Sequence, residues 1–411
     1  MSNIAKDAGK EGDGSSSRSA ALLNQPIVMD VGTCTTKAGF AGGSKPKVNI
    51  GTKVGRAKHV RIMPGGALEQ EQNSSVFVGT KLDDHRGAFL LDYPMDKGCV
   101  KDNNAGWESM ERIWEHVYGK ACLNAKMEDH PVLLTECPLN PKTHRERMAE
   151  VFFETFRAPA LCLAPPAVLS LYASGRTTGV VLDVGEGVAH CIPVYEGYAL
   201  PHSITRSNVA GRDVTDYLQL LLRRGSGLHL TTTAERDLCQ TIKEQACYLS
   251  TTATSNNNNN SNSNVEEGVA DVPYQLPDGQ TINLTHQERS KAPEILFDPF
   301  LMGSEEMGVA DLVSSAIAKS DLDLRTTLYS QIVLAGGSTH TPGFGDRFLA
   351  ELRSRAPAHT RIRISAPPER IHSAWAGGSI LASLSTFKHM WVTAAEYEEH
   401  GNRILQNRGS L

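Results

Sequence analysis

The sequence predicts an α/β protein built from two duplicated halves. Two apolar segments carry this prediction, residues 27–41 (IVMDVGTCTTKAGFA) and residues 179–200 (GVVLDVGEGVAHCIPVYEGYAL). Each is typical of a β-hairpin, because two apolar runs flank a polar turn that contains glycine. Their Asp-Val-Gly triplets begin at Asp30 and Asp183. This separation of roughly 150 residues indicates a duplicated domain rather than a short repeat.

The two turns have the composition of a phosphate site. Glycine has no Cβ, so successive backbone N–H groups can point into one concavity and hold an anion. Asp183 ends its predicted strand, where a carboxylate can hold a hydrated Mg²⁺ beside a phosphate. A third apolar run, residues 332–339 (IVLAGGST), ends in glycines suited to close approach of a ligand. One Asp-Val-Gly turn alone more often joins ordinary strands. Two of them, with the glycine strand, predict a nucleotide in a cleft between the halves.

The bulk composition excludes several classes of protein. The 411 residues suffice for two or three domains, and 40% hydrophobic and 21% charged residues are ordinary values. A net charge of −5 argues against a nucleic-acid surface. No apolar run reaches the ~18 residues that span a bilayer, and no secretory leader is apparent. The eight cysteines form no Cys-x-x-Cys pair. We therefore expect reduced thiols in the cytoplasm, with no nucleic-acid partner and no membrane insertion.

Helical periodicity and end signals predict the main helices. Residues 107–118 and 145–156 place apolar side chains on one face, which indicates a core helix rather than a cofactor site. Residues 213–224 form a third helix, for which Gly225 is the expected C′ residue. Residues 231–249 open with threonines that can cap a fourth helix. Further helices are expected from Pro166, from Phe344, and over residues 373–387.

Three segments have compositions that cannot bury a core. Residues 1–24 and 64–75 are polar, and residues 250–264 (STTATSNNNNNSNSN) are of low complexity. We expect a disordered N-terminal extension and two mobile surface loops. For the Asn-rich loop, a tolerated insertion is favoured over a partner-binding role.

Several longer motifs resemble the actin family. They occupy residues 169–179 (LSLYASGRTTG), 195–202 (YEGYALPH), 210–213, 276–280 (LPDGQ) and 375–387 (WAGGSILASLSTF), and the resemblance covers residues 25 to about 401. Within the family the chain resembles the centractin group, whose members form the short filament of dynactin. The segments that favour this group are 24–30 (NQPIVMD), 58–69 (KHVRIMPGGALE), 150–156, 319–325 (KSDLDLR), 343–347 and 361–367 (RIRISAP).

The resemblance implies the duplicated ATPase fold of the ribonuclease H-like or hexokinase type, with two halves around a nucleotide cleft. It implies a first-half core of residues 25–51, 94–173 and 372–411, interrupted by a small insertion subdomain over 52–93. The second-half core then comprises residues 174–209 and 304–371. A second insertion subdomain covers 210–303 and carries the Asn-rich loop.

The resemblance also implies ATP or ADP with Mg²⁺ as cofactors, and a set of site residues. Asp30 and Asp183 would hold the metal through water, and Asp183 and His190 would be the catalytic residues. Lys37 would neutralise phosphate charge, while Asp213 and Glu244 would accept hydrogen bonds from ribose hydroxyls. The implied nucleotide-binding residues are Asp30, Gly32, Thr33, Lys37, Asp183, Gly185, Gly187, Val188, Gly211, Arg212, Asp213, Lys243, Glu244, Gly336 and Gly337.

The turns themselves depart from the family pattern. Val31 and Cys34 replace an Asn and a Gly of the first turn, and Val184 and Glu186 replace a Ser and an Asp of the second. Valine removes a side-chain hydrogen bond but leaves the backbone amide available. Cys34 is the more serious change if its position requires a positive φ. Ile371 stands where actins have a Lys that covers the base, and apolar stacking would partly replace it.

The departure at Pro166 bears on hydrolysis. Actins carry a Gln there that orients the attacking water, and positioning of that water is most of what a protein contributes to the reaction. Proline has no side-chain donor, so only Asp183 and His190 remain near the family's water site. His190 is equally well explained as a satisfied strand histidine. We therefore expect at most a slow ATPase. The residues from 404 onward also lack the family's basic-aromatic ending.

The expected function is a filament subunit of dynactin that supports dynein-driven transport along microtubules. Its expected partners are further copies of itself, other dynactin subunits, and dynein with its adaptors, in the cytoplasm and cytoskeleton. The alternatives are a nuclear actin-related subunit of a chromatin-remodelling complex, a conventional actin-like ATPase, and a sugar or acetate kinase on the same core. Fold alone does not decide among them.

Overall fold

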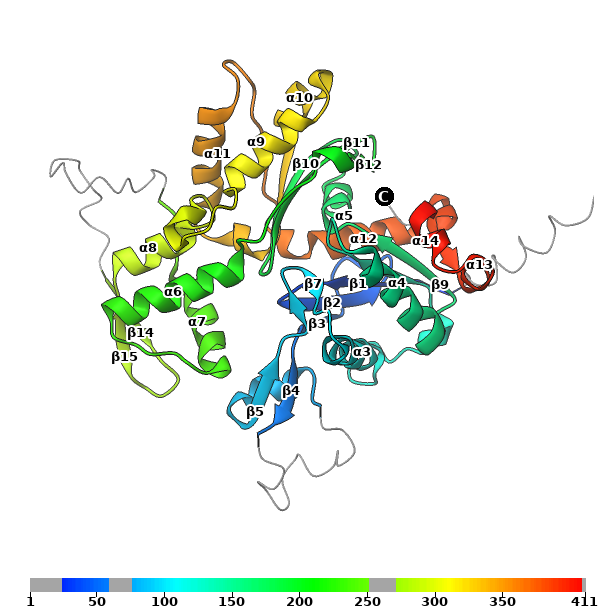
Figure 1. The fold of residues 1–411 in the computed structure, drawn as a ribbon, viewed down its shortest axis with the longest axis horizontal. Coiled ribbons are helices and arrows are strands. Elements are labelled where there is room, and N and C mark those ends of the chain that lie inside the picture. The colour runs from blue at the N-terminus through cyan, green and yellow to red at the C-terminus, as the bar shows by residue number, and fades with distance from the viewer. Residues whose placement is uncertain (1–23, 59–75, 251–270, 409–411) are drawn as a thin grey trace, which may run out of the picture.

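The computed structural model describes residues 24–58, 76–250 and 271–408, which form two halves, each built on one central sheet (Figure 1). The first sheet has the order β18-β9-β8-β1-β2-β3 and the second has the order β12-β11-β10-β16-β17. The strands of the first sheet are β1 (Ile27–Val31), β2 (Thr35–Phe40), β3 (Val48–Gly51), β8 (Val132–Thr135), β9 (Ala160–Ala164) and β18 (Val392–Thr393). Those of the second are β10 (Gly179–Val184), β11 (Ala189–Tyr195), β12 (Tyr198–Ala199), β13 (Thr205–Ser207), β16 (Ile332–Ala335) and β17 (Ile364–Ser365).

The two sheets follow the same path. In the first, β1, β2 and β3 form an antiparallel meander, and β8 and then β9 add in parallel on the other side of β1. In the second, β10, β11 and β12 form the meander, and β16 and β17 add in parallel beside β10. Both predicted Asp-Val-Gly hairpins are present as β1–β2 and β10–β11. The prediction of a duplicated α/β fold is confirmed.

The helices of the first half begin and end close to the predicted positions. Asn103 caps α3 (Asn104–Tyr118) by accepting a hydrogen bond from Gly106 N at 2.7 Å. The helix expected over 145–156 begins earlier, as α4 (Lys142–Glu150), and continues as a π-helical turn over Val151–Thr155. This turn directs Phe152 toward Trp114, whose ring centroid lies 5.0 Å away. The local periodicity did not indicate a change of helix type.

Two short helices, α5 (Pro166–Ala173) and α12 (Ser373–Ser383), lie where the halves join (Figure 1). Pro166 is the first residue of α5, as predicted, and its missing N–H has no partner to lose there. The two helices touch backbone to backbone, because a Cβ at Gly377 would lie 1.7 Å from Leu169 O. The helix expected over 373–387 ends at Ser383, and a 3₁₀ segment, Ser385–Met390, follows it.

The second half contains α9 (Val309–Lys319), α10 (Leu322–Tyr329) and α11 (Phe344–Arg355), with an inserted unit below them in Figure 1. The inserted unit comprises α6 (Gly211–Gly225), α7 (Thr233–Ala246), α8 (His286–Glu294) and the hairpin of β14 (Val272–Gln275) and β15 (Thr281–Leu284). Thr232 caps α7 as predicted, in a capping box with Glu235. The helix ends at Ala246 rather than Leu249, because Cys247 is already extended.

The assignment of Gly225 as a C′ residue was wrong. Gly225 is the last residue of α6 and does not have a positive φ, whereas Gly227 has a φ of +67°. A Cβ at Gly225 would lie 2.3 Å from Glu288 Oε1. Glycine at this position therefore allows close packing against Glu288 of α8 and does not act as a helix stop.

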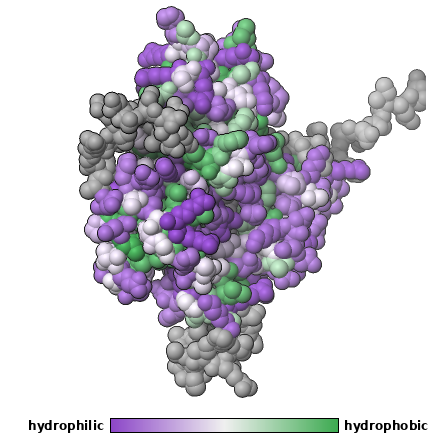
Figure 2. Space-filling model, turned by 60° about the vertical axis from the view of Figure 1, so that its left-hand side comes forward, coloured by the Kyte–Doolittle hydropathy of each residue, from purple (hydrophilic) through white to green (hydrophobic). Residues whose placement is uncertain are grey.

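A smaller unit extends from the first half. It contains β4 (Val54–Ala57), α2 (Thr80–Asp84) and β5 (Phe89–Asp92), whereas β6 (Met95–Asp96) and β7 (Cys99–Val100) pack on the core of the first half. Helices α13 (Ala394–His400) and α14 (Arg403–Arg408) end the described chain. The expected loops over 1–23, 64–75 and 251–264 lie outside the described residues. Within the described part, no helix is long and apolar enough to cross a membrane. The face in Figure 2 is mostly hydrophilic, with apolar residues in small separate groups.

Candidate nucleotide site

A cavity of about 560 Å³ lies between the two halves. Its size suits a small-molecule ligand. Both Asp-Val-Gly turns contribute to its wall, together with the starts of α5, α6 and α12, residues of α7 and the end of β16. Fourteen of the sequence-predicted site residues line it: Asp30, Gly32, Thr33, Lys37, Asp183, Gly185, Gly187, Val188, His190, Gly211, Lys243, Glu244, Gly336 and Gly337. Arg212 and Asp213 lie beside this cavity and do not line it.

The two turns have matching backbone geometry and touch each other. Gly32 N donates to Thr35 O and Gly185 N donates to Val188 O, both at 3.0 Å. A Cβ at Gly187 would lie 2.5 Å from Thr33 Oγ1, so only glycine permits this approach. Cys34 is not among the described residues with a positive φ. The side chain that replaces glycine there therefore adds no backbone strain.

The carboxylates of Asp30 and Asp183 face the same cavity. Lys37 Nζ lies 3.1 Å from Asp30 Oδ2, and Thr135 Oγ1 donates to Asp30 Oδ1 at 3.1 Å. Burial and the negative charge of Asp30 raise the pKa of Asp183 to about 7, although Lys37 acts in the opposite direction. Thr135 was missed by sequence reasoning. Its only signal is that it ends an apolar run, residues 132–135, which becomes the strand next to β1.

These two carboxylates fit a divalent cation. Two facing acidic groups with one lysine between them leave an excess of buried negative charge, which a hydrated Mg²⁺ would neutralise. The described residues contain no cluster of three or more His, Cys, Asp or Glu side chains with metal-ligand geometry. A cation held by Asp30 and Asp183 would therefore complete its coordination with water and ligand oxygens.

His190 is buried beside Asp183 and is neutral. Its Nε2 lies 3.8 Å from Asp183 Oδ2. Burial, with a smaller effect of the Arg206 charge, lowers the pKa of His190 to about 3. The contact is therefore not an ion pair at neutral pH. Both ring nitrogens lack a hydrogen-bond partner among the described residues. This disfavours the interpretation of His190 as a satisfied strand histidine, and its ring lines the cavity.

Pro166 also lines the cavity, and its ring presents no hydrogen-bond donor. The neighbouring wall is made by Glu136 and Cys137, which follow β8 and which sequence reasoning did not select. Glu136 is paired with Arg145, and burial raises the pKa of its carboxyl. Both wall residues come from the end of a parallel strand, a frequent location for ligand sites in α/β sheets.

The cavity wall on the side of the second half is shaped by closely packed glycines and by one ion pair. Gly336 has a φ of +85°, and a Cβ there would lie 2.4 Å from Asp183 Oδ1. Lys243 Nζ contacts Glu186 Oε2 at 3.1 Å and Gly211 O at 2.8 Å. Glu186, a departure from the family pattern, therefore fixes the amine of Lys243 beside the start of α6.

Comparisons with known proteins identify the family. The family model described as Actin matches residues 22–410. The chain is 49% identical over 385 residues to an actin-like protein of Neurospora crassa, covering 93% of this chain and 98% of that protein. This chain belongs to the actin family. Members of the actin family bind a nucleotide with a divalent metal, in agreement with the composition of the cavity.

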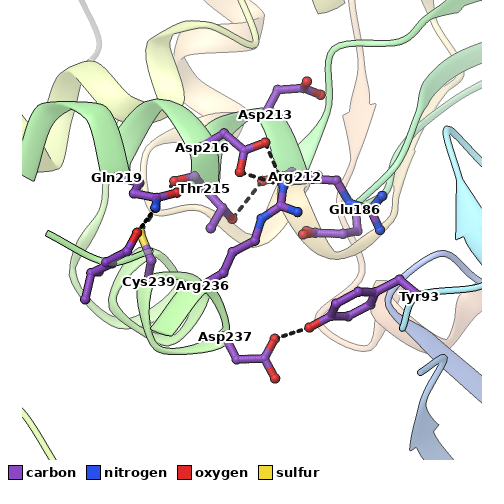
Figure 3. Close-up of polar contacts among 12 residues, drawn as sticks. Tyr93, Glu186, Arg212, Asp213, Thr215, Asp216, Gln219, Arg236, Asp237 and Cys239 are labelled. Carbon is purple, nitrogen blue, oxygen red and sulfur yellow. Dashed lines mark hydrogen bonds and ion pairs between the residues drawn. The ribbon is translucent and has the colours of Figure 1, made fainter. Parts of the chain in front are cut away.

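In this actin-family protein, polar contacts connect the two halves near the cavity, and Figure 3 shows one of them, between Tyr93 and Asp237. Asp237 on α7 accepts hydrogen bonds from Lys53 Nζ, at 2.8 Å, and from the Tyr93 hydroxyl. Lys97 Nζ lies 3.0 Å from Asp213 Oδ1. Asp213, which we expected to bind ribose, also caps α6 by accepting from Ala210 N at 2.9 Å. Its carboxylate is therefore already engaged.

Arg212 makes a similar contact. Its Nη1 lies 3.1 Å from Asp96 Oδ1, and its guanidinium lies over the ring of Tyr93, 5.8 Å from the centroid. Arg212 and Asp213 therefore connect the second half to the segment around β6. The nucleotide roles that the resemblance implies for Arg212 and Asp213 stay predictions.

Proposed function

We propose that this protein is a centractin-type filament subunit that binds ATP or ADP with Mg²⁺ and hydrolyses ATP slowly. The observation that carries the proposal is the cavity between two hairpins of the same construction, each presenting an aspartate. A phosphate chain there would meet the backbone N–H groups of two glycine-containing turns and the ammonium group of Lys37. When bound, Mg²⁺ would neutralise phosphate charge beside Asp30 and Asp183.

Slow hydrolysis is proposed from the wall around Pro166. An attacking water needs a group that orients it, and proline offers none through its side chain. The neutral ring of His190, with two unpartnered nitrogens, is the candidate that remains near Asp183. His190 can accept a hydrogen bond from water, but its lowered pKa makes it a poor proton acceptor.

Nucleotide binding is tested with Lys37→Met and a fluorescent ATP analogue. Loss of a charge-assisted contact to phosphate should weaken binding by roughly 10-fold or more. The control is Lys45→Met, because Lys45 pairs with Glu369 and its side chain is 70% exposed. Equal affinities of the two variants would contradict the proposed position of the phosphates.

The dynactin role is supported by the centractin-like segments of the sequence alone. Under this proposal the protein assembles with itself and with other dynactin subunits in the cytoplasm and cytoskeleton. The assembly then acts with dynein and its adaptors in transport along microtubules. The test is affinity purification of the tagged full chain from its own cells, followed by mass spectrometry. Dynactin subunits should co-purify in fixed ratio. Recovery of chromatin-remodelling subunits instead would favour the nuclear alternative.

A further inference from the structure

Two cysteines, Cys99 and Cys137, line the same small cavity, and their thiols interact electrostatically. Cys99 begins β7, and Cys137 follows the end of β8. Both are half-buried, and both are free thiols. The pair therefore joins two segments that are distant in the sequence, and neither cysteine is fully buried.

The backbone around Gly98 holds the two thiols together. Gly98 has a φ of +78°, and a Cβ at this position would lie 2.9 Å from Cys137 Sγ and 2.8 Å from Val188 Cγ1. Only glycine lets the β6–β7 turn approach Cys137 this closely. The contact between the thiols thus follows from the packing of the turn.

Arg206, on β13 of the second half, is fixed beside the pair. Its Nη2 donates to Lys97 O at 2.6 Å, and its Nη1 donates to Pro138 O at 3.3 Å. These carbonyls belong to the two segments that carry the cysteines. The charge of the guanidinium also lowers the pKa of Cys99. A positive group held in this way stabilises a thiolate relative to a thiol.

The groups around the pair shift the pKa values of the two thiols in opposite directions. The interaction with Cys137 lowers the pKa of Cys99, with further contributions from Arg206 and His144, although burial opposes the shift. The same interaction and burial raise the pKa of Cys137, and the negative charge of Asp183 adds to this. These interactions favour a thiolate at Cys99 over a thiolate at Cys137.

A small cavity opens beside both sulfurs. Its volume is about 30 Å³, and its lining includes Cys99, Cys137, Trp107 and His144. A water molecule needs roughly 10–15 Å³ on the same measure. There is consequently room for a molecule with two oxygen atoms next to the thiolate.

We propose that Cys99 and Cys137 form a redox-active pair that hydrogen peroxide converts into an intramolecular disulfide. The Cys99 thiolate attacks one peroxide oxygen, the O–O bond breaks, and hydroxide leaves, so that Cys99 becomes a sulfenic acid. Cys137 then attacks Cys99 Sγ, the S–S bond forms and the S–O bond breaks. The hydroxide released takes up the Cys137 proton as water. Two electrons pass from the two sulfurs to the peroxide, and a thiol reductant reverses the reaction.

The disulfide would tie the β6–β7 turn to the end of β8. That turn carries Lys97, which contacts Asp213 of the other half. Oxidation would therefore fix the position of a segment that connects the two halves. The covalent step itself does not require a bound nucleotide.

The test is peptide-level mass spectrometry of the reduced full-length protein after brief treatment with hydrogen peroxide at pH 7 and alkylation of the remaining thiols. Cys99 and Cys137 should lose reactivity together, at least about tenfold faster than Cys122, and appear as one linked peptide pair. Cys122 is the internal reference because it is also half-buried and burial raises its pKa. Dithiothreitol should restore both thiols.

Variants separate the two steps. In Cys137→Ser, dimedone should trap a sulfenic acid at Cys99 and no disulfide should form. Arg206→Gln should slow the loss of Cys99 several-fold, whereas Cys122→Ser should leave its rate unchanged. Oxidation of Cys99 at the rate of Cys122, or a link from Cys99 to any other cysteine, would overturn the proposal. The comparison within the wild-type chain holds even if a variant does not fold.

Discussion

Lys37 and His190 occupy the same position in the two duplicated hairpins. Lys37 is the cross-strand neighbour of Asp30 on β2, and His190 is the cross-strand neighbour of Asp183 on β11. The first aspartate therefore faces an ammonium group at 3.1 Å, whereas the second faces a neutral imidazole. One positive charge serves two carboxylates. Burial, together with this imbalance of charge, raises the pKa of Asp183, and the excess negative charge favours binding of a cation.

The raised pKa of Asp183 predicts a specific dependence of stability on pH. Its folded-state value of about 7 lies above the usual value near 4, so the native state holds a proton that the unfolded state releases between these values. The contribution of Asp183 to stability therefore falls as the pH rises through this window. Asp183→Asn should raise the free energy of unfolding at pH 8 by roughly 1–3 kcal/mol more than at pH 5. This range allows for screening by solvent in the cavity.

Urea denaturation of the nucleotide-free protein in a chelator, at the two pH values, measures this difference. The lowered pKa of His190 makes the free energy of unfolding rise with pH, which is opposite to the effect of Asp183. His190 is present in both proteins, so its effect cancels in the comparison. The control is Asp84→Asn, since Asp84 is exposed at the end of α2. A stability change at Asp183 that is the same at both pH values would contradict the assignment.

A second prediction concerns hydrolysis. Pro166→Gln should increase the rate of single-turnover ATP hydrolysis by assembled filaments, on the order of 10²-fold, because it adds a donor that can orient water. Pro166→Ala is the matched control, since it removes the ring without adding a donor. If the wild type already hydrolyses ATP as fast as conventional actin, another group positions the water and our interpretation of Pro166 is wrong.

A third prediction concerns the mouth of the cavity. Asp237→Asn removes the charge that Lys53 contacts across the mouth, where both side chains are at most 12% exposed. Loss of 1–2 kcal/mol from the closed state would speed release of bound nucleotide by roughly 5- to 30-fold. Stopped-flow release of a fluorescent analogue measures the rate. Asp216→Asn is the control because Asp216 pairs with Arg236 between α6 and α7, without crossing the mouth. Equal release rates in the two variants would count against a role for this contact.

A fourth prediction compares two glycines within helices. Gly377→Ala should destabilise the protein by at least about 3 kcal/mol, since its Cβ would overlap a backbone carbonyl of α5. Gly345→Ala, in α11, should instead stabilise it by roughly 0.5–1 kcal/mol, because nothing lies within 4 Å of the new methyl group. Thermal unfolding of the two variants and of the wild type measures these changes in stability. A similar effect in both would show that α5 and α12 can move apart at little cost.

The hairpins and the glycine strand were predictable because their signal is local. Apolar runs, turn residues and the duplication of the Asp-Val-Gly triplet all lie within short segments. Thr135 and Glu136 were not predictable in this way, since their place in the cavity wall follows from strand order in the sheet.

Gly225 shows another limit of prediction from sequence. A glycine that ends a helix and a glycine that admits a distant carboxylate look identical in the sequence, and only Glu288 distinguishes them.

Asp213 has contacts that its expected role in ribose binding did not predict. The residue has the expected position at the start of α6, but its carboxylate is used by Ala210 N and Lys97. Cys34 illustrates the opposite case. Its replacement of glycine indicated strain, yet the backbone there has an ordinary φ, so the substitution is tolerated.

The contact between Gly377 and Leu169 has a mechanical consequence. The backbones of α12 and α5 meet there without an intervening side chain, near the line where the two halves join (Figure 1). The two halves would rotate about such a contact. The units that carry Lys53 and Asp237 lie far from it, so they would move farthest. A slight rotation at the contact would become a large displacement at the mouth. Polar contacts at the far ends of the two units, such as that of Lys53 with Asp237, would therefore oppose such a rotation with a long lever arm.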